Sequence, residues 1–206
     1  MAMRSHRVML GGVPKKVDHH VRRREIADAL WRVVAAKGFA AVSLRQVAAE
    51  AGVSMGLVQH YFDSRERMLL FALDSVSERA REHIAVELAG HPEPAPRAVV
   101  RALLTQVLPL DEQRRREGHA LFAFLAEGGR GGVVGERMRA DMLRFTDALA
   151  EQVRRGAATP DPERAAVLLL AVADGLTAHV LGGHLDPADA LTALDDQLNH
   201  VFGAIG

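Results

Sequence analysis

Apolar residues recur every three to four positions along most of this 206-residue chain, and short breaks rich in glycine or proline divide the pattern into segments. Such spacing puts the apolar side chains on one face of an α-helix. No run alternates apolar and polar residues between turn signals, as a half-buried strand would. The sequence therefore predicts an all-α protein of about nine helices, packed as antiparallel neighbours through short connections. The expected helices span residues 18–37, 43–51, 54–61, 64–89, 96–108, 111–127, 132–155, 162–181 and 187–202.

Charge is distributed unevenly, although the 26 basic and 26 acidic residues cancel overall. Residues 1–67 hold 12 basic and 6 acidic side chains, so the remainder is acidic by the same margin. An excess of basic residues in the segment 1–67 favours contact with an anion. The alternative is a solvated surface on which the charged residues are distributed by chance. Residues 1–16 combine glycines, a proline and four basic side chains without periodicity. They predict a flexible basic arm, which either reaches a DNA minor groove or stays solvated.

Several classes of function lack the residues they need. The chain has no cysteine, which excludes disulfides and thiol chemistry. No apolar run approaches the ~18 residues of a membrane span, and the first 16 residues are too polar for a signal peptide. These features predict a cytoplasmic protein with no membrane partner. The pattern G-x-S-x-G at 52–56 lies on a helical segment instead of after a strand, so we expect no catalytic site, cofactor or metal. A helical enzyme or carrier that uses Ser54 or the region of His119 and His179 is the alternative.

The segment 43–62 carries the strongest functional pattern. Ala48 is small where two helices must cross closely, and Gly52 follows where the turn needs a positive φ. Ser43 and Ser54 stand where helix caps are expected, and their helix ends offer N–H groups to a phosphate. Aliphatic residues fill the wedge between the two helices: Leu44, Val47, Val53 and Val58. This spacing predicts a helix-turn-helix, and the alternative is a plain helical hairpin with solvated polar residues.

The expected DNA-contacting residues are Ser43, Arg45, Gln46, Ser54, Met55, Gly56, Leu57, Gln59, His60 and Tyr61. Gln59 is suited to an adenine edge, and Met55 or Leu57 to a thymine methyl group. Arg45 lies in the first turn of the helix that crosses the DNA backbone, where a phosphate contact is expected. Glycine inside a helix costs about 1 kcal/mol relative to alanine. Close approach of the backbone to DNA would explain Gly56, and simple tolerance is the alternative.

The stretch SLRQVAAEAGVSMGLVQHYFDSRERMLL, residues 43–70, resembles the DNA-binding signature of the tetracycline-repressor (TetR) family. The residues Asp174-Gly175-Leu176 and the Pro187-headed final helix are similar to the branch that contains choline-responsive repressors. The resemblance implies a homodimer that binds a palindromic double-stranded DNA operator and is released by a small-molecule effector. It divides the chain into a DNA-binding domain, 17–63, and an effector-binding and dimerisation domain, 64–206. Two residues depart from the family pattern: Leu57 stands where Thr or Ser is common, and Gln59 stands where Tyr is common. These departures put the operator sequence in doubt.

The expected effector contacts are Leu104, Leu108, His119, Phe122, Met138, Met142, Phe145, Asp174, Thr177 and His179. Core packing is the alternative for the apolar members, and a structural hydrogen bond for the polar ones. An aromatic cage for a quaternary ammonium is poorly supplied, because the only Trp (Trp31) and the only Tyr (Tyr61) lie in the DNA-reading part. We therefore expect an apolar effector with one or two polar anchors.

The last two expected helices carry more apolar surface than one core can bury. The helix 162–181 is apolar on more than one face, and the helix 187–202 has one apolar stripe. An isologous four-helix interface between two copies would cover this surface, and a two-fold protein matches a palindromic site. Effector binding is then expected to shift the helix 64–89 and with it the spacing of the two recognition helices.

Overall fold

The structure is a computed structural model that describes residues 19–126 and 132–203. Within these ranges it contains nine α-helices, one short 3-10 helix and no strand, so the predicted all-α class is confirmed. The elements are α1 (His19–Lys37), η1 (Phe39–Ala41), α2 (Leu44–Glu50), α3 (Met55–Tyr61), α4 (Arg65–Leu88), α5 (Pro96–Thr105), α6 (Glu112–Ala126), α7 (Gly132–Gly156), α8 (Pro162–Leu181) and α9 (Pro187–Phe202). The basic arm expected at residues 1–16 lies outside the described residues.

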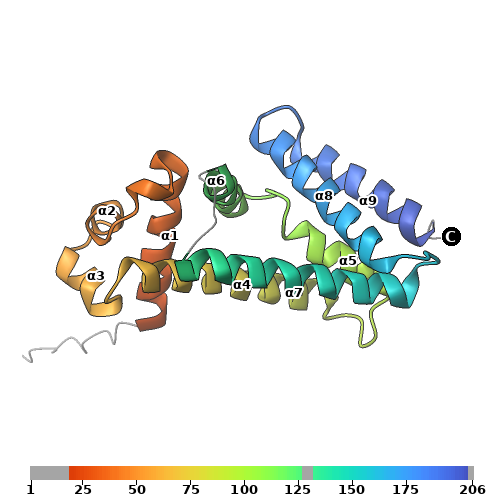
Figure 1. Ribbon diagram of the computed structural model, residues 1–206, viewed down its shortest axis with the longest axis horizontal. Helices are drawn as coiled ribbons and strands as arrows, with labels where there is room; N and C mark the ends of the chain where they lie inside the picture. The colour runs from red at the N-terminus through yellow and green to blue at the C-terminus, as the bar shows by residue number, and fades with distance from the viewer. Residues whose placement is uncertain (1–18, 127–131, 204–206) are drawn as a thin grey trace, which may run out of the picture.

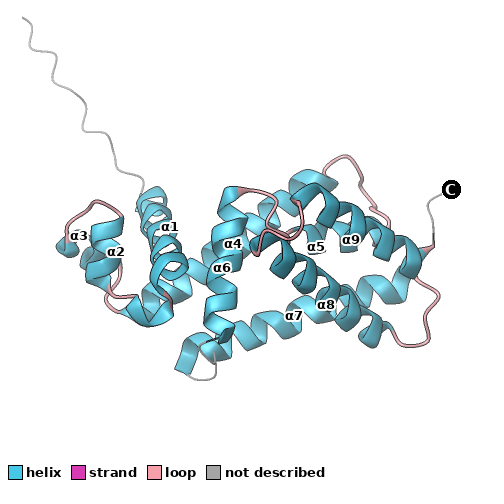
Figure 2. Ribbon diagram, turned by 90° about the horizontal axis from the view of Figure 1, so that it is seen from above, coloured by secondary structure: helices cyan, strands magenta, loops and turns pink. Residues whose placement is uncertain are grey.

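The molecule is elongated, with α1, α2 and α3 at one end and α8 and α9 at the other (Figure 1). The two long helices α4 and α7 run along its length and contact each other. Between the two ends, α6 packs against α1 (Figure 2). The N-terminal helices therefore touch the C-terminal part through both α4 and α6.

The starts of three helices follow from a serine that precedes each of them. The hydroxyl oxygen of Ser43 accepts the backbone N–H of Gln46 at 3.2 Å, and that of Ser54 accepts the N–H of Leu57 at 3.1 Å. Ser64 caps α4 in the same way. Between α2 and α3, Gly52 has a φ of +66°, a conformation that glycine adopts without steric cost.

The first hydrophobic core holds the N-terminal helices together. The buried face of α1 meets Val47 of α2 and Val58 of α3, both of which have no exposed surface. The same core includes buried residues of α4 and Ala120 of α6. Packing therefore continues past residue 63, where the domain division was expected.

The second hydrophobic core lies among α5, α7, α8 and α9. Its fully buried side chains include Leu104, Leu108, Leu149, Leu169, Leu194 and Leu198. Helix α8 is long and apolar enough to cross a membrane by length and composition alone, a test that the core helix of a soluble protein also passes. Val167 and Leu168 of α8 are 54% and 57% exposed, which leaves an apolar face uncovered in the single chain.

Candidate nucleic-acid interface and ligand pocket

Helix α3 exposes four of its seven residues to solvent and is anchored by one buried side chain. Val58 is fully buried in the first core, whereas Met55, Gly56, Gln59 and His60 are exposed. Of the other expected DNA contacts, Ser54 is exposed, and Leu57 and Tyr61 are half-buried. A helix held by a buried aliphatic residue and exposed elsewhere has the arrangement needed to enter a major groove.

Helix α2 lies beside α3 and contributes the remaining expected contacts. Arg45 and Gln46 are exposed, and Ser43 is half-buried at the cap. The structure thus brings the ten predicted DNA-contacting residues together on two neighbouring helices.

One residue on this surface was missed by the sequence analysis. The ring of His19, at the start of α1, lies 6.4 Å from that of His60 and 5.7 Å from that of Tyr61, measured between ring centroids. The rings of His60 and Tyr61 are 5.2 Å apart. His19 gave no signal in the sequence because it lies more than forty residues from its ring partners.

The arginines of α1 are engaged within the protein. Arg22 pairs with Glu25 at 2.6 Å, and Arg24 pairs with Glu78 at 2.7 Å. The guanidinium of Arg23 lies over the ring of Phe71, 4.2 Å from its centroid. These contacts favour a structural role over the phosphate contacts that three consecutive arginines also suggest.

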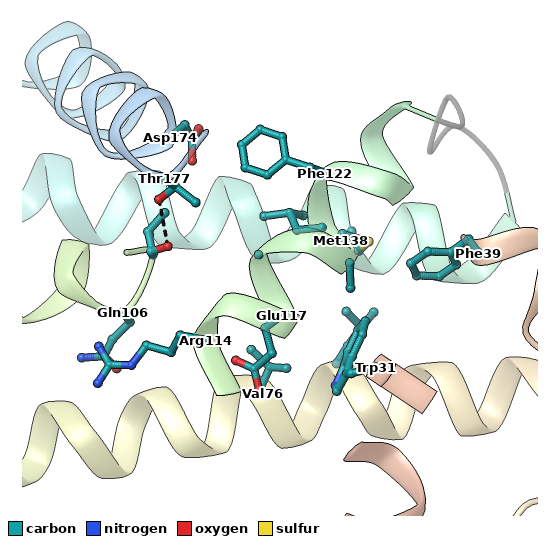
Figure 3. Close-up of a pocket in the computed structure, with 15 residues that line it drawn as sticks. Trp31, Phe39, Val76, Gln106, Arg114, Glu117, Phe122, Met138, Asp174 and Thr177 are labelled. Atoms are coloured by element: carbon teal, nitrogen blue, oxygen red, sulfur yellow. Dashed lines mark hydrogen bonds between the residues drawn. The ribbon is translucent and has the colours of Figure 1, made fainter. Parts of the chain in front are cut away.

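A cavity of about 210 Å³ lies between the N-terminal helices and the C-terminal bundle (Figure 3). Its walls come from α1, η1, α4, α6, α7, α8 and the residues that follow α5. The lining residues are Trp31, Phe39, Leu73, Val76, Gln106, Val107, Arg114, Glu117, Gly118, Ala120, Leu121, Phe122, Met138, Asp174 and Thr177. The walls are mainly apolar, with a few polar groups at separate points, as is usual for small-molecule sites.

Four of the ten predicted effector contacts line this cavity: Phe122, Met138, Asp174 and Thr177. The other six do not. Leu104, Leu108 and Phe145 pack in the second core, because the apolar faces of α5 and α7 turn toward α8 and α9. His119, Met142 and His179 are exposed.

The premise about the aromatic cage is wrong. Trp31 belongs to α1, yet it lines the cavity together with Phe39 of η1 and Phe122 of α6 (Figure 3). The sequence analysis assigned Trp31 to the DNA-reading part alone, because nothing in the local pattern shows that α1 faces the bundle. Three aromatic residues from three elements therefore contribute to the cavity wall.

The polar groups of the cavity differ in how well they are paired. The Thr177 hydroxyl donates to the carbonyl of Val107 at 3.0 Å, which is the structural hydrogen bond weighed above as the alternative. Arg114 pairs with Asp111 at 2.8 Å, and Glu117 accepts from Arg79 and from Gln113. Asp174 is half-buried and has no hydrogen-bond or ion-pair partner among the described residues. Its burial raises the pKa of the Asp174 carboxyl above the ordinary value.

Two family models match the chain. The first, described as bacterial regulatory proteins of the tetR family, covers residues 26–71, and the second, described as the C-terminal domain of BetI-type transcriptional repressors, covers residues 96–203. The chain is 32% identical to the HTH-type transcriptional regulator PksA of Bacillus subtilis over 185 residues, which is 85% of this chain and 84% of PksA. It is 30% identical to the regulator BetI of Rhizobium meliloti over 164 residues, 80% of each chain.

Solved structures agree with these matches. A transcriptional regulator from Rhodococcus superposes with a TM-score of 0.74 at 30% identity, over 89% of this chain and 99% of that one. A regulator from Saccharomonospora viridis, solved in complex with choline, superposes with a TM-score of 0.73 at 24% identity, over 88% of this chain and 97% of that one. The chain belongs to the TetR family of transcriptional regulators and carries a C-terminal domain of the BetI type.

Proposed function

We propose that this protein is a dimeric repressor that inserts α3 of each chain into one half of a two-fold operator and releases the DNA when an apolar organic cation fills the cavity. The observation that carries the effector class is the composition of the cavity walls. Aromatic rings attract cations through their faces, and Asp174 offers a carboxylate without a partner among the described residues. The role in transcription places its action in the cytoplasm, where the chromosome lies.

Operator binding is tested with the DNA directly upstream of this chain's own gene. We expect sequence-selective shifts in a gel assay that weaken as the salt concentration rises, because phosphate contacts release counterions. Binding that ignores sequence and salt would reject the repressor function.

Gln59 and Arg45 are expected to act differently on the operator. Gln59→Ala should relax base preference at one position by about 1–3 kcal/mol, because an exposed amide on α3 reads a base edge. Arg45→Ala should weaken binding to all sequences equally and reduce the salt slope by about 1. Affinities for a panel of single-base operator variants at two salt concentrations distinguish the two effects. Identical profiles for both variants would contradict these roles.

Effector binding has a built-in reporter, because Trp31 is the single tryptophan of the chain and lines the cavity. Choline and benzyltrimethylammonium are suitable probes, one with a hydroxyl and one with an aromatic ring on a quaternary nitrogen. A saturable change in intrinsic fluorescence, accompanied by release of operator DNA, is expected for at least one of them. A neutral isostere of benzyltrimethylammonium, neopentylbenzene, should bind more weakly.

Asp174→Asn is expected to stabilise the fold and to weaken cation binding. Because the native pKa of Asp174 is raised, the native state holds this proton more tightly than the unfolded chain does. The ionised carboxylate therefore costs stability, and this cost grows as the pH rises from the unfolded pKa through the raised native pKa. The variant should be more stable than the parent at pH 7, and the difference should vanish below about pH 3.9.

The affinity of the variant for the cation probes should fall about tenfold or more, since two opposite unit charges about 4 Å apart attract each other by about 4 kcal/mol at an effective dielectric constant of about 20, and desolvation offsets only part of this. Denaturant unfolding and Trp31 titrations measure the two effects. Asp147→Asn is the matched control, because Asp147 is an exposed acid of α7 that does not line the cavity. Unchanged cation affinity in Asp174→Asn would reject the proposed anchor.

The dimer is proposed to form through α8 and α9. Four exposed residues share one face of α8 at helical spacing: Leu168, Ala171, Gly175 and Ala178. Three of them are small, which lets another helix approach closely, and apart from the adjoining backbone of α8 itself no atom lies within 4 Å of the position where a Cβ of Gly175 would be. An apolar face of this kind in a soluble regulator is best covered by its copy in a second chain.

A further inference from the structure

Arg79 joins the N-terminal helices to the wall of the cavity. It lies on α4, and its guanidinium contacts Asp28 of α1 at 3.3 Å and also pairs with Glu117 of α6. Gln113 of α6 lies across the same two acids, with its amide nitrogen 3.4 Å from Asp28 and 2.8 Å from Glu117. Three helices that are distant in sequence therefore meet at one side chain.

Both ends of this network lead to functional surfaces. Glu117 lines the cavity, where Figure 3 shows it beside Val76 and near Trp31. Asp28 lies three residues before Trp31, so both residues are on the same side of α1. Helix α1 also belongs to the first hydrophobic core, where its buried residues Ile26, Leu30 and Trp31 share one cluster with Val47 of α2 and Val58 of α3. A displacement of α1 consequently moves α2 and α3.

The network holds one positive and two negative side chains, because the single guanidinium of Arg79 pairs with the carboxylates of both Asp28 and Glu117. The side chains of Arg79 and Glu117 are only 19% and 16% exposed, so solvent screens their interaction poorly. The Nε of Arg79 is also buried without a hydrogen-bond partner. A cation in the cavity would give Glu117 a second positively charged partner besides Arg79, and the arginine would then be drawn toward Asp28.

We infer that Arg79 is the positioning residue that transmits occupancy of the cavity to the DNA-binding helices, by dividing its charge between Glu117 at the cavity and Asp28 on α1. This inference rests on the proposed function, because it takes the cavity to be the effector site. Arg79 itself does not line the cavity and lies on α4, outside the helices α2 and α3 that are proposed to contact DNA. Its role is to couple the two binding events.

The first test needs no effector. Operator affinity is measured for Asp28→Asn, Glu117→Gln and the double variant in the full-length protein. Because both acids act through Arg79, we expect the double variant to deviate more than threefold from the product of the single effects. In the control cycle Glu78→Gln takes the place of Asp28→Asn. Glu78 also links α1 to α4, but through Arg24 and not through Arg79. The Glu78→Gln and Glu117→Gln pair should combine within about twofold. The inference would be overturned if the double variant of Asp28 and Glu117 lost operator affinity by the product of the two single losses. It would also be overturned if both cycles deviated from that product by the same factor.

The second test measures the coupling itself. Benzyltrimethylammonium is titrated through Trp31 fluorescence in the presence and absence of operator, for the parent, Asp28→Asn and Glu78→Gln. Linkage requires the factor by which the probe weakens DNA binding to equal the factor by which DNA weakens probe binding. We expect this factor to be fivefold or more in the parent and in Glu78→Gln, and to fall below twofold in Asp28→Asn, with probe affinity of the DNA-free protein changed by less than threefold.

The outcomes of the two tests distinguish a failure of the role inferred for Arg79 from a failure of the effector class proposed for the cavity. Full coupling in Asp28→Asn would overturn the role of Arg79, even with the cavity established as the effector site. A parent protein whose operator binding ignores the probe would instead reject the proposed effector class, and the effector-free cycle would still decide the role of Arg79. Thermal unfolding of each variant shows whether the two α1–α4 ion pairs contribute equally to stability, which keeps loss of coupling apart from loss of structure.

Discussion

Leu168→Glu is expected to prevent the proposed dimer from forming and to weaken operator binding by about 10²–10⁴-fold. Leu168 is 57% exposed in the single chain, so the change leaves the chain's own cores intact. In the proposed four-helix interface, however, two glutamates would face an apolar surface, and burying an unpaired charge is costly. Loss of the dimer removes the effective concentration that links binding of the two half-sites. Sedimentation velocity and gel-shift titration measure the two consequences.

Val86→Glu provides the control for this change. Val86 is 78% exposed on α4, outside the α8 face formed by Leu168, Ala171, Gly175 and Ala178, and the substitution introduces the same charge. It should leave both the mass of the particle and the operator affinity unchanged. A dimer that persists in Leu168→Glu would mean that another surface joins the two chains.

The second large effect is expected at Gly56, where adding a side chain should raise the stability of the fold and a large side chain should lower the affinity for the operator. An added Cβ would meet only the Ser54 hydroxyl oxygen, at 4.0 Å, so packing within the chain does not require glycine here. Gly56→Ala should therefore stabilise the fold by up to about 1 kcal/mol through helix propensity. Gly56→Leu should also fold, because the position is exposed. Its operator affinity should fall by a hundredfold or more, since the longer side chain would occupy the space in which the backbone approaches DNA.

The three proteins form a series that separates fold from interface. Denaturant unfolding gives the stability of each, and fluorescence anisotropy with a labelled operator duplex gives the affinity. Ala85→Leu is the size control, because Ala85 is an exposed residue of α4 outside the DNA-binding helices. Operator affinity that is unchanged in Gly56→Leu would show that the glycine is merely tolerated, which is the alternative stated for it above.

The DNA-binding helices were predictable because their signals are local. A serine cap acts within three residues of itself, and the turn at Gly52 depends on its own φ angle. The wedge residue Val58 lies within the same short segment and is fully buried, as its spacing predicts. The contribution of His19 was not predictable in this way, since the approach of α1 to the end of α3 depends on how two separate helices pack.

The cavity was predicted only in part, and the failures have a common cause. Apolar spacing shows which face of a helix is buried but not which neighbour that face meets. Leu104 and Leu108 were therefore indistinguishable from Phe122 in the sequence, although the first two pack in the second core and Phe122 lines the cavity. Trp31 was assigned to the wrong surroundings for the same reason.

The sequence alone determined the helical class, the helix-turn-helix and the serines that begin its helices, because each depends on interactions between residues close in the chain. Only the tertiary structure decided that α1 supplies Trp31 to the cavity and that Arg79 lies between Asp28 and Glu117. Arg79 lies 51 positions from Asp28 and 38 from Glu117, and Trp31 lies 146 positions from Thr177 on the same cavity wall. Their meeting depends on how whole helices pack, which local spacing does not encode.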